Sequence, residues 1–311
     1  MKKKITAVIA IVFVALLILF SLGRKEVQKD FFAMDTVISV KTEGFFADKA
    51  TTEAEKEILR LHDELSVNGD GALDSYNKGE YSGGEVSYLL SESERIRKET
   101  GGAFDAGIYS VSKLWGFTED DFRVPSEEEI EEGLKYKGTE FDFGAIAKGY
   151  GADRVREILS VNKIKNATVS LGGTVLLYGD SEKTFAIASP GGEGYAGYIK
   201  AKNVVISTSG GYERYFEENG EKYSHIINPE TGYPAKSGIL SATIISESGT
   251  ESDSFSTSVF VMGEDKAKKL WEKEDFEAVI ITDDGRMIIT EGIENTVTGI
   301  DEKYEVEIWR K

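Results

Sequence analysis

The segment FDFGAIAKGYGADRV, residues 141–155, constrains this chain more than any other. Its apolar spacing predicts that residues 141–143 end a buried strand and that a helix begins at about Ala145. Lys148 then lies in the first helical turn, where free backbone N–H groups and the helix dipole favour a bound phosphate. The segment lacks the glycine and the Ser or Thr of a P-loop. It therefore predicts either another kind of phosphate-binding turn or a tight packing turn with a solvated lysine.

Composition narrows the classes of function. The 311 residues include 55 acidic and 37 basic side chains, which gives a formal net charge of −18. Such a surface repels nucleic acid, so we expect no nucleic-acid partner. The chain has no cysteine and two histidines. These counts exclude a disulfide and a thiolate nucleophile, and they disfavour a histidine-rich metal centre.

The N-terminus has the form of an export signal, because three lysines precede a nearly unbroken apolar run from Ile5 to Phe20. We expect residues 1–23 to be a signal peptide or signal anchor, residues 24–30 a linker, and residues 31–311 the folded domain. The lysines predict an extracytoplasmic domain at the outer face of a bacterial cytoplasmic membrane, either anchored or secreted. Cleavage stays open, since the run approaches the ~20 residues that span a bilayer.

The remainder predicts one α+β domain of mixed sheets and helices, built as two intimately packed subdomains. The expected elements are a strand over residues 31–40, helices over 51–65, 86–99 and 145–160, an acidic helix capped by Ser126, a strand interrupted at Gly172-Gly173, and hairpins with turns at Asn219-Gly220 and Asp284-Gly285. A G-x-G-x-x-G match at residues 192–197 precedes a strand-like segment. It therefore predicts a loop and not a dinucleotide site.

Asp253 and Thr257 lie four residues apart at the expected start of a helix, so both side chains share one face. A carboxylate and a hydroxyl suit Mg²⁺, which takes oxygen ligands and shares its shell with waters and phosphates. The alternative is that Asp253 caps the helix and Thr257 is a buried helix residue. Asp142 likewise has the alternative of a turn residue at a strand end.

His225 follows a predicted hairpin strand and precedes a turn, which makes it either a general base or a structural histidine. The other histidine, His62, lies in the helical sequence LHDEL, and we expect an ordinary helix residue there. Residues 208–210 predict a turn of small residues, which either holds a ligand or only connects two strands.

Seven segments, in order, resemble the FAD:protein FMN transferases of the ApbE family over about residues 34–263. The segments are MDT at 34–36, AFDAGIYSVSKLWGF at 103–117, FDFGAIAKGYGADRV at 141–155, SLGG at 170–173, TSGGYERY at 208–215, HIINPETGYP at 225–234 and DSFST at 253–257. One such motif is weak, but seven in order leave chance a poor explanation.

The resemblance implies an extracytoplasmic, Mg²⁺-dependent enzyme. Such an enzyme splits the pyrophosphate of FAD, attaches FMN through a phosphoester to a Thr or Ser of an exported flavoprotein, and releases AMP. It implies that His225 deprotonates the acceptor hydroxyl. Metal ligands are implied at Asp253, Thr257 and the Ala145 carbonyl. The implied FAD-binding residues are Met34, Asn68, Ala103, Phe104, Asp105, Asp142, Lys148, Thr208 and Ile227.

One departure from the family concerns Asn68. The family often reads L-S-T-Y after the first helix, whereas this chain reads Leu65-Ser66-Val67-Asn68. Asparagine cannot stack on an isoalloxazine ring as an aromatic side chain does. The alternatives are an FAD pyrophosphatase that gives FMN and AMP, or a local rearrangement in which Tyr76 replaces the missing aromatic. A non-catalytic flavin-binding protein is a third hypothesis, and the retained histidine, lysine and metal-ligand residues argue against it.

Overall fold

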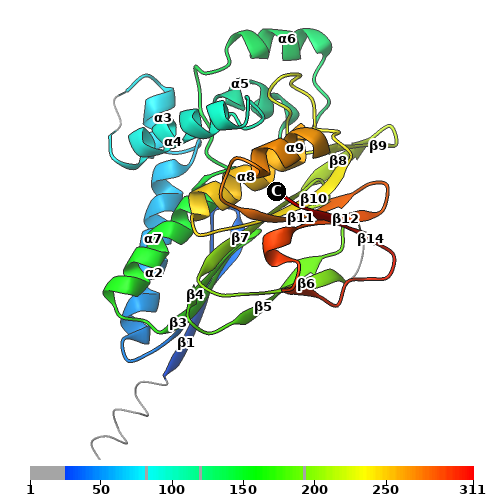
Figure 1. Cartoon of the computed structure of the whole chain (residues 1–311). Helices are drawn as coiled ribbons and strands as arrows, with labels where there is room; N and C mark the ends of the chain where they lie inside the picture. The colour runs from blue at the N-terminus through cyan, green and yellow to red at the C-terminus, as the bar shows by residue number, and fades with distance from the viewer. Residues whose placement is uncertain (1–24, 81–82, 119–120, 192–193) are drawn as a thin grey trace, which may run out of the picture.

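The computed structural model describes residues 25–80, 83–118, 121–191 and 194–311, and its centre is a nine-stranded sheet (Figure 1). In spatial order the strands are β1 (Glu26–Ala33), β2 (Thr36–Glu43), β3 (Asn166–Leu171), β4 (Thr174–Gly179), β7 (Val204–Gly210), β10 (Ile239–Ser246), β11 (Glu277–Thr282), β12 (Arg286–Thr290) and β14 (Glu305–Trp309). Neighbouring strands are antiparallel except β12 and β14, which are parallel.

The remaining strands form two smaller sheets. One consists of β13 (Val297–Thr298), β6 (Tyr195–Ala201) and β5 (Lys183–Ala188), and the other of β8 (Tyr215–Glu218) and β9 (Glu221–Ser224). The three-stranded sheet packs on the large sheet through a shared apolar cluster that includes Ile187, Ile199 and Val279. Strands at the centre of the large sheet are therefore buried on both faces, which explains their nearly continuous apolar sequence.

The other face of the large sheet is covered mainly by three long helices, α2 (Ala47–Leu65), α7 (Ala147–Val161) and α8 (Gly249–Met262), while α5 (Tyr109–Ser112) and α6 (Glu127–Lys135) lie away from it (Figure 1). The remaining helices are α3 (Ala72–Asn77), α4 (Glu85–Glu99) and α9 (Glu264–Trp271), with 3-10 turns at Ala106–Ile108, Lys113–Trp115 and Glu291–Ile293. Within the described ranges, none of these helices has the length and hydropathy needed to cross a bilayer. The expected signal or anchor over residues 1–23 lies outside the described residues.

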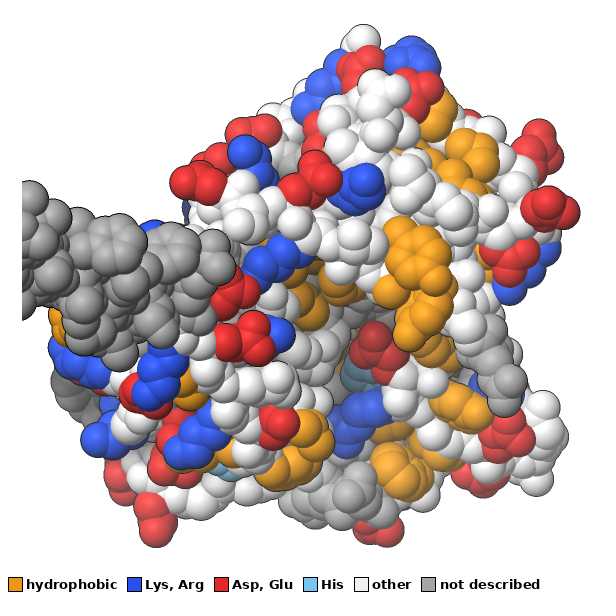
Figure 2. All heavy atoms as spheres, turned by 90° about the horizontal axis from the view of Figure 1, so that it is seen from below, with side chains coloured by type: hydrophobic (Ala, Val, Ile, Leu, Met, Phe, Trp, Pro, Cys, Tyr) orange, Lys and Arg blue, Asp and Glu red, His pale blue; other side chains and the backbone are white. Residues whose placement is uncertain are grey.

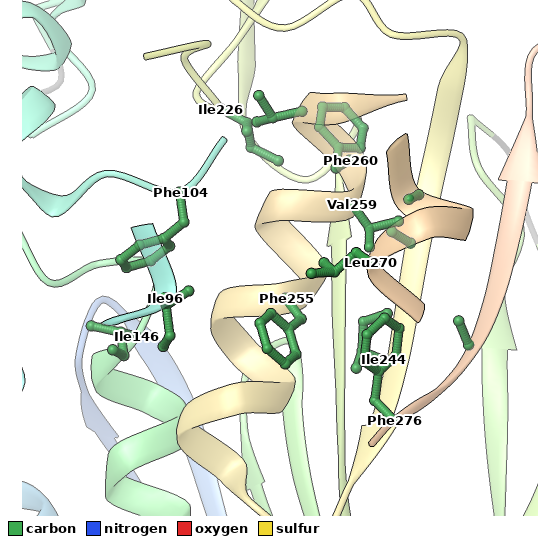
Figure 3. Close-up of a cluster of buried hydrophobic side chains, with 14 of the residues drawn as sticks. Ile96, Phe104, Ile146, Ile226, Ile244, Phe255, Val259, Phe260, Leu270 and Phe276 are labelled. Carbon is green, nitrogen blue, oxygen red and sulfur yellow. The ribbon is translucent and has the colours of Figure 1, made fainter. Parts of the chain in front are cut away.

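Helix α8 is buried around most of its circumference and organises the core. Figure 3 shows Phe255 and Val259 of α8 between Ile146 on one side and Ile244 on the other. Its serines add little bulk, and their buried hydroxyls donate to backbone carbonyls, as Ser252 does to the carbonyl of Ile244 at 2.9 Å. Small, internally satisfied side chains therefore let a polar sequence pack tightly against α7 and the sheet.

The expected strand over residues 31–40 is wrong in its extent, because the chain reverses at Met34 and Asp35. Both residues have positive φ, 49° and 57°, and they join β1 to β2 as an antiparallel hairpin. Strand β1 begins at Glu26, so residues 26–30 of the expected linker belong to the sheet. The turn has no glycine and the apolar pattern runs through it, which is why the sequence did not reveal it.

Three further local predictions need correction. Residues 141–143 form no strand, so α7 is entered from a loop. Gly172 and Gly173 do not interrupt one strand but form the turn between β3 and β4. Thr208 lies within β7 and not in a turn, paired with Thr243 of β10. For Thr208 the pairing of β7 with the distant strand β10 decided the conformation, which local propensity does not report.

Other predictions are confirmed. Ser126 caps α6 in a reciprocal capping box with Glu129. The β8–β9 hairpin turns at Asn219 and Gly220, both with positive φ, as a tight hairpin requires. Strand β6 contains the segment after the G-x-G-x-x-G match, as its sequence indicated, but it begins at Tyr195, so residues 195–197 of the match are strand and not the expected loop.

Candidate functional site

A cavity of about 570 Å³ opens where α2 ends and α7 begins, against the ends of β2, β7 and β9. Figure 2 shows a hollow in which acidic, basic and histidine side chains lie together. The cavity is large enough for a dinucleotide-sized ligand and carries both polar and apolar groups. Every residue that the sequence assigned to catalysis, ligand binding or metal binding lines it, namely Met34, Asn68, Ala103, Phe104, Asp105, Asp142, Ala145, Lys148, Thr208, His225, Ile227, Asp253 and Thr257.

The first turn of α7 supplies the cationic part of the wall. Lys148 is the second residue of the helix, as predicted, and its Nζ donates to the carbonyl of Gly144 at 2.8 Å. Asp142 lies beside it and accepts a hydrogen bond from the N–H of Gly144 at 2.9 Å. Burial raises the pKa of Asp142, and neighbouring Asp35 acts in the same direction, while the Gly144 bond and Lys148 oppose the shift. A helix start and an ammonium group together provide an anion-binding surface.

Asp253 faces the same wall from α8, but in the helix interior. Helix α8 begins at Gly249 and is capped by Ser248, so the expectation of a site at the helix start is wrong, and Asp253 is no N-cap. Its Oδ2 accepts from the N–H of Gly149 at 2.9 Å, and its Oδ1 accepts from the hydroxyl of Thr174 at 3.2 Å. The carboxylate is thereby held in one orientation toward the cavity.

The hydrogen bond between Gly149 and Asp253 is possible because α7 and α8 pack closely together. A Cβ at Gly149 would meet the carbonyl oxygen of Gly249 at 2.0 Å and the Cβ of Asp253 at 2.6 Å. Any side chain at Gly149 would therefore separate the two helices. The glycine is required here for close backbone approach and not for a left-handed conformation.

Thr257 lies one turn beyond Asp253 on α8 and also lines the cavity. Its hydroxyl is 3.1 Å from that of Ser209, which is itself 2.8 Å from the hydroxyl of Ser256. Thr208 lines the cavity beside Ser209, and its hydroxyl pairs with that of Thr243 at 2.9 Å. Hydroxyls of β7 and α8, which can donate or accept, thus line this part of the cavity.

The donor set fits a hard divalent cation. Oxygen atoms are available from the Asp253 carboxylate, the Thr257 hydroxyl and the Ala145 carbonyl, all on the cavity wall. Glu213 adds a carboxylate whose pKa is raised, first by desolvation and then by Asp253, with Lys148 opposing the shift. Across the described part of the chain, no cluster of three His, Cys, Asp or Glu side chains suits a metal ion. A cation here would therefore need hydroxyl, carbonyl and ligand oxygens, as Mg²⁺ commonly does.

His225 lies directly after β9 on the opposite side of the cavity. Its Nδ1 lies 3.1 Å from the backbone carbonyl of Arg214. A carbonyl oxygen only accepts, so Nδ1 carries the proton and donates, and Nε2 keeps its free lone pair. Burial lowers the pKa of His225 to about 4, and the charges of Arg214 and Lys148 act in the same direction, while the hydrogen bond to Arg214 opposes them. The imidazole is therefore neutral and able to accept a proton near pH 7.

Asn68 lies on the cavity wall and is exposed. The hydroxyl of Ser66 donates to the backbone carbonyl of Asn68 at 2.7 Å. This bond holds the backbone of Asn68 and does not involve its side-chain amide. Tyr76, the proposed substitute aromatic, is not among the residues that line the cavity. It packs edge to face on Phe141, with ring centroids 5.9 Å apart. Tyr76 therefore does not supply an aromatic side chain to the cavity wall in place of Asn68, contrary to that alternative.

The 103–105 segment is held in place through the carboxylate of Asp105. Asp105 accepts from the N–H of Gly107 at 2.9 Å and forms an ion pair with Lys137 at 3.1 Å. Lys137 also donates to the carbonyl of Pro229 at 3.1 Å, in the loop that carries Ile227. Two parts of the wall that are distant in sequence are thus fixed to each other.

Several residues that line the cavity were not predicted from the sequence. His62 accepts a hydrogen bond at Nδ1 from the N–H of Met34 at 3.2 Å, so it is more than an ordinary helix residue. Phe117 contacts the His225 ring, with centroids 6.2 Å apart, and its carbonyl accepts from Arg214 at 2.6 Å. The rarity of histidine in the chain was the one signal that pointed to His62.

Comparison with known proteins gives this site its context. A family model described as the ApbE family matches residues 34–280. Similar curated proteins include the FAD:protein FMN transferase of Treponema pallidum, 30% identical over 258 residues that cover 70% of this chain and 71% of that protein. The FAD:protein FMN transferase of Haemophilus influenzae is 29% identical over 271 residues, 77% of this chain and 76% of that protein.

Solved structures of ApbE proteins have a similar fold. The ApbE protein of Thermotoga maritima has a TM-score of 0.81 and 30% identity, covering 88% of this chain and 99% of that one. The flavinyl transferase ApbE of Pseudomonas stutzeri has a TM-score of 0.74 and 25% identity. The match covers 83% of this chain and 91% of that one. The fold and cavity thus define an enzyme of the transferase class. The chain belongs to the ApbE family.

Proposed function

We propose that this protein is a Mg²⁺-dependent FAD:protein FMN transferase. It cleaves the pyrophosphate of FAD, attaches FMN by a phosphoester bond to a Thr or Ser of an exported flavoprotein, and releases AMP. The observation that carries the proposal is the convergence of Lys148, Asp253, Thr257 and His225 on one cavity from three separate segments of the chain. The names of the curated relatives support the same activity.

His225 acts as the general base. Its Nε2 takes the proton of the acceptor hydroxyl as the hydroxyl oxygen bonds to the phosphorus of the FMN half. The P–O bond to the AMP half then breaks, and AMP leaves with the bond electrons. The hydrogen bond from Nδ1 to the Arg214 carbonyl holds the tautomer that this step requires.

Asp253, Thr257 and the Ala145 carbonyl would hold Mg²⁺ together with oxygens of the substrate. When bound, the cation neutralises charge on the pyrophosphate and polarises its P–O bonds. Lys148 and the first turn of α7 bind the phosphate oxygens from the other side. Positioning and charge neutralisation are the main requirements of phosphoryl transfer, so these residues form a sufficient set.

A second activity is favoured by Asn68. With asparagine and not an aromatic side chain at position 68, the flavin ring is less completely covered there, and water can reach the phosphorus in place of a protein hydroxyl. The same site then works as an FAD pyrophosphatase that gives FMN and AMP. The bond that breaks is identical in the two reactions.

The proposed location is the outer face of the cytoplasmic membrane, with the N-terminal apolar segment as signal or anchor. An exported acceptor flavoprotein is the matching partner.

Incubation of the full chain with FAD and Mg²⁺, with and without a peptide that bears an acceptor threonine, tests the proposal. Mass spectrometry of the peptide and chromatography of the nucleotides are the readouts. A covalent FMN adduct on the peptide supports transfer, and FMN with AMP alone supports hydrolysis. Intact FAD in both reactions rejects both activities and leaves flavin binding without catalysis.

A further inference from the structure

Three apolar side chains are exposed together at the end of α2 that lies away from the cavity. Phe45 and Phe46 are 50% and 46% exposed, and their rings form an edge-to-face pair with centroids 4.9 Å apart. Val161, at the end of α7, is 78% exposed. The N–H of Lys165 donates to the carbonyl of Glu43 at 3.2 Å, which joins the two helix ends. We call Phe45, Phe46 and Val161 the apolar end of the molecule.

Lysines surround the apolar end. The acidic side chains here are mostly paired, in the ion pairs Lys25–Asp48, Lys41–Glu26 and Lys49–Glu53. Lys163 and Lys165 form no ion pair with any residue that the structure describes. In a chain with a net charge of −18, this end therefore offers lysines that are free to contact phosphate groups.

The chain enters the fold at this same end. The carbonyl of Lys25 accepts a hydrogen bond from the N–H of Gly44 at 3.0 Å, which places Lys25 next to Phe45. In the sequence, Lys25 follows shortly after the apolar run that ends at Phe20. Surfaces that rest in the interface of a bilayer combine lysines with bulky apolar side chains such as Phe.

We propose that the apolar end rests in the interfacial layer of the membrane and orients the enzyme on it. This inference rests on the proposed anchor. Helix α2 has 19 residues, which at about 1.5 Å per residue give a length of about 28 Å. The last turns of α2, with Leu61, His62 and Leu65, line the cavity.

The helix therefore holds the cavity roughly 28 Å from the membrane surface. The hollow is open in the view from below, the side on which β1 begins (Figures 1 and 2). The cavity thus faces the bilayer across this gap, which suits an acceptor domain that is itself close to the membrane.

Depth-dependent fluorescence quenching tests the inference. The full chain is reconstituted in vesicles of phosphatidylethanolamine and phosphatidylglycerol, part of which carries bromine near the head of the acyl chains. Single variants Phe46→Trp and Val161→Trp place a probe at the apolar end. The variant Phe32→Trp is the matched control, because Phe32 is 66% exposed near the other end of β1. The native tryptophans, all buried, provide the baseline in the parent protein.

The added emission is the tryptophan fluorescence of a variant minus that of the parent protein. We expect brominated vesicles to quench most of it for the probes at positions 46 and 161, and to leave it unchanged for the probe at position 32. Loss of emission at position 32 equal to that at 46 would mean that the protein lies on its side, which overturns the orientation. A vesicle-bound chain whose probe at 46 is unquenched overturns the contact but leaves the anchor. A chain that does not float with the vesicles overturns both. The FAD assay, run on the same preparations, reports the proposed activity independently.

Discussion

The carboxylate of Asp253 accepts a hydrogen bond from the backbone N–H of Gly149 at 2.9 Å, and this contact ties α8 to α7 beside the cavity. The glycine permits the helix approach, and the approach orients the carboxylate. Structure and proposed chemistry therefore depend on the same pair of residues.

Gly149→Ala should lower the free energy of unfolding by about 2–3 kcal/mol, because the new methyl group meets the backbone of Gly249 and the Cβ of Asp253. Urea denaturation followed by circular dichroism measures this loss. Gly144→Ala is the control, since a Cβ there meets nothing closer than 3.4 Å. Equal stability of the two variants would show that the helices can separate at little cost.

Asp253→Asn should reduce kcat/KM for FAD at least ~100-fold and raise the Mg²⁺ concentration needed for half-maximal rate, because the amide carries no charge for the cation. The amide oxygen still accepts from Gly149, so the fold should persist. Thr257→Ser, which keeps the hydroxyl, should retain most activity, and Thr257→Val should not. A magnesium titration identical to that of the parent would reject the proposed metal site.

His225→Ala should lower FMN transfer by ~100-fold or more while FAD still binds. In the parent, burial depresses the pKa of His225 to about 4, and the neutral ring is the active form. When kcat/KM for transfer is plotted against pH, the titration of His225 should therefore cause no change between pH 6 and 8. The value should fall only as the pH drops toward 4. A profile that falls with a midpoint near 6.5 would mean that the base is not the desolvated His225.

His62→Ala should weaken FAD binding several-fold, because the N–H of Met34 loses its acceptor and the positive-φ turn at the cavity wall is released. His62→Gln, which offers another acceptor, should recover part of the affinity. Fluorescence titration with FAD measures both variants. Parent-like affinity in the alanine variant would limit His62 to helix packing.

Asn68→Tyr should slow the release of free FMN and AMP and tighten FAD binding, because a tyrosine ring covers the flavin. Asn68→Ser, which adds no ring, is the control and should hydrolyse FAD like the parent. If the tyrosine variant hydrolyses FAD at the parent rate, the missing aromatic does not decide between water and the protein acceptor.

The sequence by itself determined the fold class, the hairpin at Asn219-Gly220, the capping of α6 and the position of Lys148 in a first helical turn. These features depend on side-chain periodicity and on turn and capping residues, which act over a few neighbours. The ordered motifs also indicated the family, which the comparisons establish.

Only the tertiary structure decided how these segments meet. It turned the chain at Met34 without a glycine, moved Asp253 from a helix start to a helix interior, excluded Tyr76 from the cavity, and gave His62 a partner. Such outcomes depend on contacts between residues far apart in the chain, for which local propensity carries no information. The free Nε2 of His225 follows in the same way from one backbone carbonyl that the fold brings within 3.1 Å of its ring.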